Sequence, residues 1–325
     1  MNEYLKIRPY QLMCIFCKSA GGFENTKSDR KLKRIFDKIR RDPDIPLTLV
    51  CNVSCNYSYQ NPGAEDDTPE GNLYNIKRDL DILQKTGLVP GTTMPARFLM
   101  EKLLESVESE EKICVGNRSG IWRGCKRSKK GAYKKARTRG LAAIIPERRS
   151  SECAKEKKIS VKKMYNAEML LIRPHHLMCM VCFSAGPSAG EPIEADNLYE
   201  AVEIIRKKPD IPVKLVEGPC MICPPCKVFL PDRKICIGNH SMGLRDEKKD
   251  LDVLQKIDMK YGDIMGAREL YSKLFAAVKS TKEICGFGDG VVRSPEWKGC
   301  GMKGRREYVK ARKKGMKIPG LKVRC

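Results

Sequence analysis

The chain has 325 residues and a net charge of +23 at pH 7, with 63 Lys and Arg against 40 Asp and Glu. This length accommodates about two domains that each bury a core. No apolar segment approaches the roughly 18 residues that span a bilayer, and the amino terminus has no signal-peptide pattern, so we expect a cytoplasmic protein without a membrane partner. In a reducing cytosol, the 16 cysteines favour metal binding or redox chemistry over disulfides.

The apolar patterning predicts the same order of elements twice along the chain. Each half opens with a short strand and a proline at the first position of a cysteine-bearing helix, Pro9 in one half and Pro174 in the other. We expect helices over 29–41, 73–86 and 94–110 and then over 197–208, 246–258 and 264–278, with strands over 47–50 and 213–216. The predicted fold class is α+β, dominated by helices.

Whole segments recur at matching places. IRPYQLMC (7–14) parallels IRPHHLMC (172–179), RRDPDIPLTLV (40–50) parallels KKPDIPVKLV (207–216), and KRDLDILQ (77–84) parallels KKDLDVLQ (248–255). Self-similarity over about 145 residues predicts two tandem homologous modules. We place the first module at 1–145, a basic linker at 146–165 and the second module at 166–325.

The repeat sorts half of the 16 cysteines into two matched sets of four. These sets are Cys14, Cys17, Cys114 and Cys125 in the first module, and Cys179, Cys182, Cys285 and Cys300 in the second. Residues three apart share a helix face, so the first two members of each set can point at one metal. Four thiolates are what a [4Fe-4S] cluster or a structural Zn2+ requires.

The second module has one further set, within CMICPPCKVFLPDRKIC (220–236). Its members are Cys220, Cys223, Cys226 and Cys236. Three cysteines at two-residue intervals are typical of a ferredoxin-type loop and would bring the total to three clusters. Cys51 and Cys55 are too few to form the same site in the first module, and Cys153 and Cys325 are expected to be exposed thiols. Zn2+ remains an alternative, because thiolate tetrads suit it equally well.

The order of motifs in the second module resembles a family. RPHHLMC, LVEGPCMICPPC, DLDVLQ and the closing EWKGC are similar to a family of small uncharacterised bacterial and archaeal proteins that open with RPHHLLC. The resemblance implies iron–sulfur binding and no established activity. It assigns the site to Pro174, His175, His176, Cys179, Cys223, Cys226, Cys236, Cys285 and Cys300. The family has a CxxC before the tryptophan, whereas here only Cys285 precedes Trp297 and Cys182 is additional, so Cys179 could instead join the loop cysteines.

His175 and His176 are the candidate catalytic residues. A helix would place His175 on the face that carries Cys179 and Cys182. A histidine at a helix amino terminus tends to stay neutral, so it could donate to a cluster sulfur, ligate iron or pass a proton. The alternative for both residues is a hydrogen bond to local backbone that fixes the helix start.

Each module ends in a basic helix. Residues 119–140 contain nine Lys or Arg and no acid, and residues 298–324 contain eleven against one acid. Matched basic segments predict an acidic partner, either an electron-carrier protein or a nucleic acid, with RNA favoured over DNA. Tyr133 and Tyr308, one in each helix, are expected to pack it down.

Three functions are compatible with these features. The leading hypothesis is an iron–sulfur protein that transfers electrons or supports redox or sulfur-handling chemistry at the second module. A zinc-stabilised nucleic-acid-binding protein and a docking or maturation scaffold are the alternatives. Whether the chain is an enzyme stays open, since it has no Walker loop, dinucleotide fingerprint or serine triad.

Overall fold

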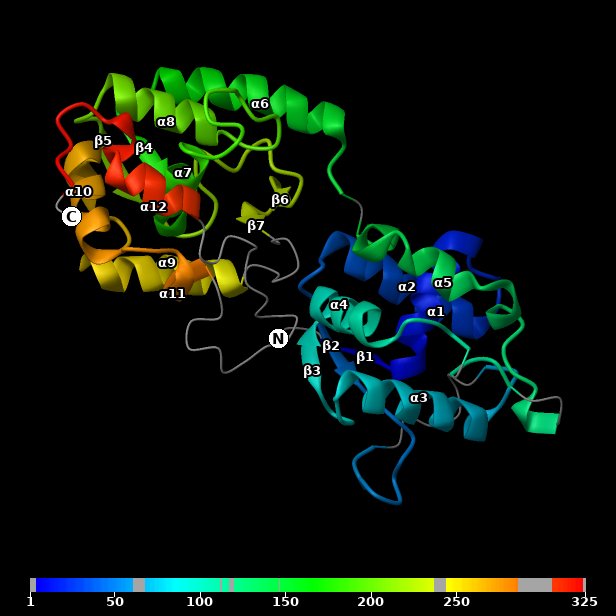
Figure 1. Cartoon of the computed structure of the whole chain (residues 1–325). Helices are drawn as coiled ribbons and strands as arrows, with labels where there is room; N and C mark the ends of the chain where they lie inside the picture. Colours follow the sequence, from blue (N-terminus) through cyan, green and yellow to red (C-terminus); the bar gives the residue numbers. More distant parts are fainter. Residues whose placement is uncertain are drawn as a thin grey trace. The chain divides into compact units, whose positions relative to one another are not determined.

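The computed structural model divides the chain into two compact units, residues 1–146 and 147–325 (Figure 1). Within them, the structure describes residues 4–60, 68–111, 113–116, 120–145, 147–236, 244–285 and 306–323. Helices dominate and the sheets are small, which confirms the expected helix-rich mixture of helix and strand. In the described part of the chain, no helix is both long and apolar enough to cross a bilayer.

The first unit is a three-stranded sheet covered by helices. Its strands are β1 (Leu5–Ile7), β2 (Pro46–Leu49) and β3 (Thr93–Pro95), and its helices are α1 (Pro9–Gly21), α2 (Lys27–Arg41), α3 (Asn72–Thr86), α4 (Ala96–Ser106) and α5 (Ala132–Arg137). Strand β2 is central, parallel to β1 and antiparallel to β3. Short 3-10 turns cover Gly120–Trp122, Ser128–Lys130 and Gly140–Ala143. Helix α1 packs against α3 and α5 and lies in the middle of the unit (Figure 1).

The second unit also has a three-stranded sheet, with the central strand parallel to one neighbour and antiparallel to the other. Its strands are β4 (Leu170–Ile172), β5 (Pro212–Leu215) and β8 (Ile264–Gly266), with a hairpin of β6 (Phe229–Leu230) and β7 (Ile235–Cys236). Its helices are α6 (Ser150–Tyr165), α7 (Pro174–Phe183), α8 (Leu198–Lys207), α9 (Leu244–Ile257), α10 (Ala267–Ala277), α11 (Lys282–Cys285) and α12 (Arg306–Lys313), with a 3-10 turn at Gly315–Lys317. Helix α7 packs against α8, α9 and α12.

The segment expected to be a linker contains helix α6. Met164 of this helix is fully buried in the core of the second unit, and the Lys157 ammonium lies 2.8 Å from the carboxylate of Glu200 on α8. Cys153, expected to be an exposed thiol, is also buried. Two buried side chains and an ion pair hold the helix down, although its composition is that of a solvated segment.

A buried ion pair fixes the start of α1 and of α7. In the first unit, the Arg8 guanidinium lies 2.8 Å from a carboxylate oxygen of Asp79, whose other oxygen accepts the Tyr10 N–H. In the second unit, Arg173 and the His175 N–H make the same contacts with Asp250. Because Pro occupies the first helical position, the carboxylate meets the next free N–H of the helix amino terminus. We name the two arrangements the Asp79 clamp and the Asp250 clamp.

The tyrosine of each basic helix packs into the core, as expected. Tyr133 on α5 and Tyr308 on α12 are fully buried. Their hydroxyls donate to the backbone carbonyls of Val107 and Val278, at 3.0 and 3.1 Å. Tyr133 therefore ties α5 to the carboxyl end of α4, and Tyr308 ties α12 to the carboxyl end of α10.

Candidate metal centres

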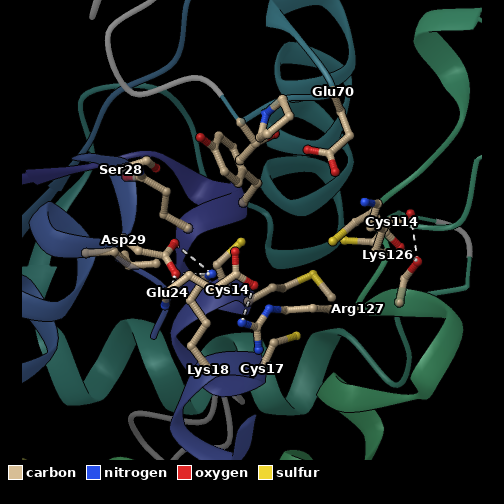
Figure 2. Close-up of a pocket in the computed structure, with 18 of the residues that line it drawn as sticks. Cys14, Cys17, Lys18, Glu24, Ser28, Asp29, Glu70, Cys114, Lys126 and Arg127 are labelled. Atoms are coloured by element: carbon tan, nitrogen blue, oxygen red, sulfur yellow. Dashed lines mark hydrogen bonds and ion pairs between the residues drawn. The ribbon is translucent and has the colours of Figure 1, made fainter. Parts of the chain in front are cut away.

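The four cysteines predicted for the first unit line one cavity of about 550 Å3. Cys14 and Cys17 project from α1, while Cys114 and Cys125 come from the segment between α4 and α5 (Figure 2). Cys114 is buried and the other three are half-buried. Thiols that are about 100 residues apart in the sequence thus face the same space, which we call the Cys14 cavity.

Hydrogen bonds hold the backbone around Cys114 and Cys125 in place. The Cys125 N–H and the Ser128 hydroxyl both donate to the Cys114 carbonyl, each at 3.0 Å. The Tyr74 hydroxyl on α3 donates to the same carbonyl and accepts the Cys125 N–H at 3.2 Å. The segment is therefore anchored to α3 through its backbone, so the two thiols stay free to face the cavity.

The sulfurs around the Cys14 cavity are too widely spaced to share one ion. A Zn–S bond of about 2.3 Å keeps any two sulfurs on a single ion within about 4.6 Å. Among the described residues, no three of these four sulfurs lie within 4.8 Å of one another. The four sulfurs, as placed, therefore do not have the spacing of ligands on one ion.

Arg78 adds a buried positive charge to the same cavity. Its side chain is 1% exposed, and its Nη1 lies 3.9 Å from the sulfur of Cys114. The guanidinium stacks on the rings of Tyr10 and Tyr74, with 4.1 and 4.6 Å to the ring centroids. Sequence analysis missed Arg78, although a cation recurs at this place in both DLD segments, where Lys249 matches it.

No carboxylate pairs with Arg78 in the described residues. Its Nη2 donates to Thr68 and Asn75, its Nε has no partner, and Asp79, the carboxylate next to it in the chain, is engaged by Arg8. Arg78 still lowers the pKa of Asp79 through its charge, and the carboxylates of Glu24, Asp29, Glu70 and Glu110 also line the cavity. Because the Arg78 guanidinium lies next to the sulfur of Cys114, it can stabilise a thiolate there.

Burial raises the pKa of three thiols of the Cys14 cavity, those of Cys14, Cys17 and Cys114. Burial raises the pKa of Cys14 to about 11 and that of Cys114 to about 12, although Arg78 opposes the rise at both. Burial and the other three thiols raise the pKa of Cys17 further. Metal binding must therefore displace protons from buried sulfurs, a step that the Arg78 charge favours.

Two of the matching cysteines of the second unit lie near Tyr308. Burial raises the pKa of this tyrosine, and the nearby thiols of Cys182 on α7 and Cys285 on α11 raise it further. In the first unit, Cys17 and Cys114 act in the same sense on Tyr133, where Arg137 opposes them. Cys179, also on α7, lies near a different tyrosine, Tyr271, and contributes to raising its pKa. Cys300, the fourth predicted member, lies outside the described residues.

Three of the remaining predicted cysteines of the second unit, Cys220, Cys223 and Cys226, lie on the loop between β5 and β6, and Cys236 ends β7. Cys220 and Cys223 are buried, and Cys226 and Cys236 are half-buried. Consecutive turns bring the first three together, because the Cys223 N–H donates to the Cys220 carbonyl and the Cys226 N–H to the Cys223 carbonyl, at 3.0 and 2.9 Å. Burial raises the pKa of Cys226 to about 11, and the neighbouring Cys236 and Cys223 contribute.

The two adjacent histidines face different partners. The His176 Nδ1 lies 3.2 Å from the sulfur of Cys220, so this ring faces the cysteine loop. The His175 Nδ1 lies 2.8 Å from a carboxylate oxygen of Asp250 and so belongs to the Asp250 clamp. Burial lowers the pKa of His175, which keeps its ring neutral. Adjacent residues on a helix point about 100° apart, which explains the separation.

Comparison with known proteins identifies one sequence family. Residues 195–288 match DUF1284, a family described as a protein of unknown function. This span includes the cysteine loop and Cys285 but neither histidine of α7. The chain matches no curated protein and no solved structure.

Proposed function

We propose that the protein is an iron–sulfur protein in which the Cys14 cavity holds a [4Fe-4S] cluster. The observation that carries this proposal is the convergence of four thiols and a buried guanidinium on one cavity of about 550 Å3. When bound, such a cluster supplies one-electron redox chemistry. Each iron of a cluster takes one thiolate, so the wide spacing of the sulfurs fits a cluster better than a single ion.

The residues of the first unit have distinct roles in this proposal. Cys14, Cys17, Cys114 and Cys125 are the ligands. Arg78 offsets the negative charge of the thiolates, and the Cys114 carbonyl is saturated by protein donors. A nearby positive charge favours the reduced, more negative state of a redox centre.

We further propose that the two units are copies and that Cys179, Cys182, Cys285 and Cys300 hold a second cluster. Both central sheets have the same strand directions, and both cysteine helices begin at an Arg–Asp clamp. The proximity of Cys182 and Cys285 to Tyr308 parallels that of Cys17 and Cys114 to Tyr133. Redox or sulfur-handling chemistry at the second unit would use this centre.

Metal and sulfide analysis of the full chain, purified without oxygen, tests the proposal. We expect iron and acid-labile sulfide in equal amounts, about four of each per occupied cluster. An EPR signal that appears on chemical reduction should accompany them. Protein that contains zinc but neither iron nor sulfide would refute the proposal.

Replacing Arg78 by methionine is expected to lower the reduction potential of the first-unit cluster. Removing a positive charge this close to the redox centre disfavours the added electron by roughly 100 mV. Arg78→Lys is the matched control, because it keeps the charge and should retain most of the potential. Equal shifts in both variants, measured by protein-film voltammetry, would show that the charge is not the cause.

The partner in this proposal is an acidic electron-carrier protein that binds the basic surface of α12. Lys282, Arg306, Lys310 and Lys313 line a shallow hollow there, with Ser280 and Val309. Two arginines of the basic helices α5 and α12 are engaged within the protein and do not face a partner. Arg137 donates to a backbone carbonyl of α4 at 3.0 Å, and Arg312 donates to one of α10 at 2.8 Å. The exposed cations that remain favour acidic surfaces through electrostatic steering.

The hollow also supports the second candidate, an RNA-binding protein, and salt dependence separates the two. If RNA is the ligand, replacing Lys310 and Lys313 by alanine should reduce the slope of log affinity against log salt by about 2. Lys33→Ala, which removes an exposed lysine of the first unit, is the control. Undetectable RNA binding at low salt would eliminate this candidate.

A further inference from the structure

A compact group is formed by His176, Cys220 and Cys223. Their ligand atoms lie closer together than the sulfurs around the Cys14 cavity. One ligand atom from each lies within 4.8 Å of the other two. The His176 Nδ1 to Cys220 Sγ distance is 3.2 Å, and the two sulfurs are 4.0 Å apart. Among the described His, Cys, Asp and Glu residues, no other group of three is this compact.

These distances are those of ligands that share one ion. With bonds of about 2.3 Å to sulfur and 2.0–2.1 Å to nitrogen, a tetrahedral Zn2+ places two sulfurs about 3.8 Å apart and a sulfur and a nitrogen about 3.6 Å apart. A [4Fe-4S] cluster takes one thiolate at each iron, so its thiolates cannot approach this closely. The loop is thus organised for a single ion, despite its ferredoxin-like cysteine spacing.

The protein holds this loop in place through its backbone. The Arg148 guanidinium donates to the Pro224 and Cys226 carbonyls at 2.6 and 2.9 Å. The Asn197 amide donates to the Met221 carbonyl at 2.9 Å, and the Asn197 N–H donates to the Ile222 carbonyl at 3.1 Å. Such contacts fix the ligands before the metal arrives, which is what a closed structural site requires.

We propose that His176, Cys220 and Cys223 bind a single Zn2+, with Cys226 from the next turn as the fourth ligand. Cys226 is the next thiol along the chain, and a turn brings it back towards the site, because its N–H donates to the Cys223 carbonyl at 2.9 Å. This zinc site is separate from the cluster sites and does not depend on the proposed iron–sulfur function. It ties the amino-terminal turn of α7 to the cysteine loop and so would stabilise the second unit.

Metal analysis of full-length variants tests the zinc site independently of iron. Wild-type protein should contain about one zinc per chain, and Cys220→Ser and Cys223→Ser should each lose nearly all of it while iron and sulfide stay unchanged. Cys55→Ser, which removes an exposed thiol of the first unit, is the control and should keep the zinc. Loss of sulfide together with retained zinc in Cys220→Ser would overturn the proposal.

A second variant keeps the test informative if the serine variants do not fold. His176→Cys replaces the nitrogen ligand by a thiolate and should keep about one metal ion per chain. With Co2+ in place of Zn2+, this variant should show stronger sulfur-to-cobalt charge-transfer absorption than the wild type. Identical cobalt spectra would show that His176 is not a ligand and would overturn the proposal, whatever the iron content.

Discussion

Replacing Cys17 and Cys114 together by serine is expected to halve the iron and sulfide content of the anaerobic protein. These thiols come from different parts of the chain, one from α1 and one from the segment after α4. A serine hydroxyl is a poor ligand for iron in a cluster, so the first-unit cluster would be lost and the proposed second-unit cluster retained. Iron and sulfide assays with quantitative EPR measure the effect.

The control for this pair is Cys55→Ser. Cys55 is exposed and does not line the Cys14 cavity, so its replacement should leave iron and sulfide unchanged. The double variant should also keep its circular dichroism spectrum if the cluster is a redox centre with little structural role. Full iron and sulfide content in the Cys17/Cys114 variant would contradict the proposed ligand set.

Replacing Asp250 by alanine is expected to reduce the free energy of unfolding of the second unit by about 3–5 kcal/mol, as is typical when one partner of a buried ion pair is removed. Asp250 is fully buried and satisfies both Arg173 and the His175 N–H. Without it, a buried guanidinium and a helix amino terminus lose their partners. Urea unfolding with hydrogen exchange of β4 and α7 measures the loss.

Asp81→Ala provides the matched control on an exposed ion pair. Asp81 pairs with Lys77 at the surface of α3, so its removal should change the free energy of unfolding by less than about 1 kcal/mol. Asp79→Ala should destabilise the first unit as Asp250→Ala destabilises the second, because Asp79 makes the corresponding contacts. Comparable effects of Asp250→Ala and Asp81→Ala would show that the clamp contributes little.

The helix positions and the strands β1, β2, β4 and β5 were largely predictable from the sequence, but β3 was not. The apolar pattern placed the third helix at 73–86, and α3 covers Asn72–Thr86. It also ran a helix over 94–110, whereas Thr93–Pro95 forms β3 and α4 begins at Ala96. The three residues of β3 pair with β2, more than 40 residues earlier, and local periodicity carries no signal for such a pairing.

The grouping of the first-unit cysteines was predicted, while their electrostatic surroundings were not. Spacing and repetition indicated that Cys14, Cys17, Cys114 and Cys125 face one space, and they line the same cavity. Arg78 looked like one of many surface cations in a helix with several charges. Its role depends on facing α1 and on the absence of a carboxylate partner among the described residues, which are properties of packing.

The sequence motif did not predict which of the two adjacent histidines faces the cysteine loop. Sequence reasoning favoured His175 because helical spacing aligns it with Cys179 and Cys182. In the structure, its ring is held by Asp250 on α9, while His176 faces Cys220 across the sheet edge. Which of two adjacent side chains meets the cysteine loop depends on how α7 packs against α9, and both partners lie far away in the sequence.

X-ray absorption at the iron edge of the anaerobic full-length protein tests the central claim most directly. If the thiols of the Cys14 cavity hold a cluster, each iron has a shell of sulfur neighbours and a second, short-range shell of iron. The Cys17/Cys114 double variant should reduce the amount of such iron without changing the remaining shells. Sulfur neighbours with no iron shell would mean isolated ions, and the iron–sulfur account would be wrong.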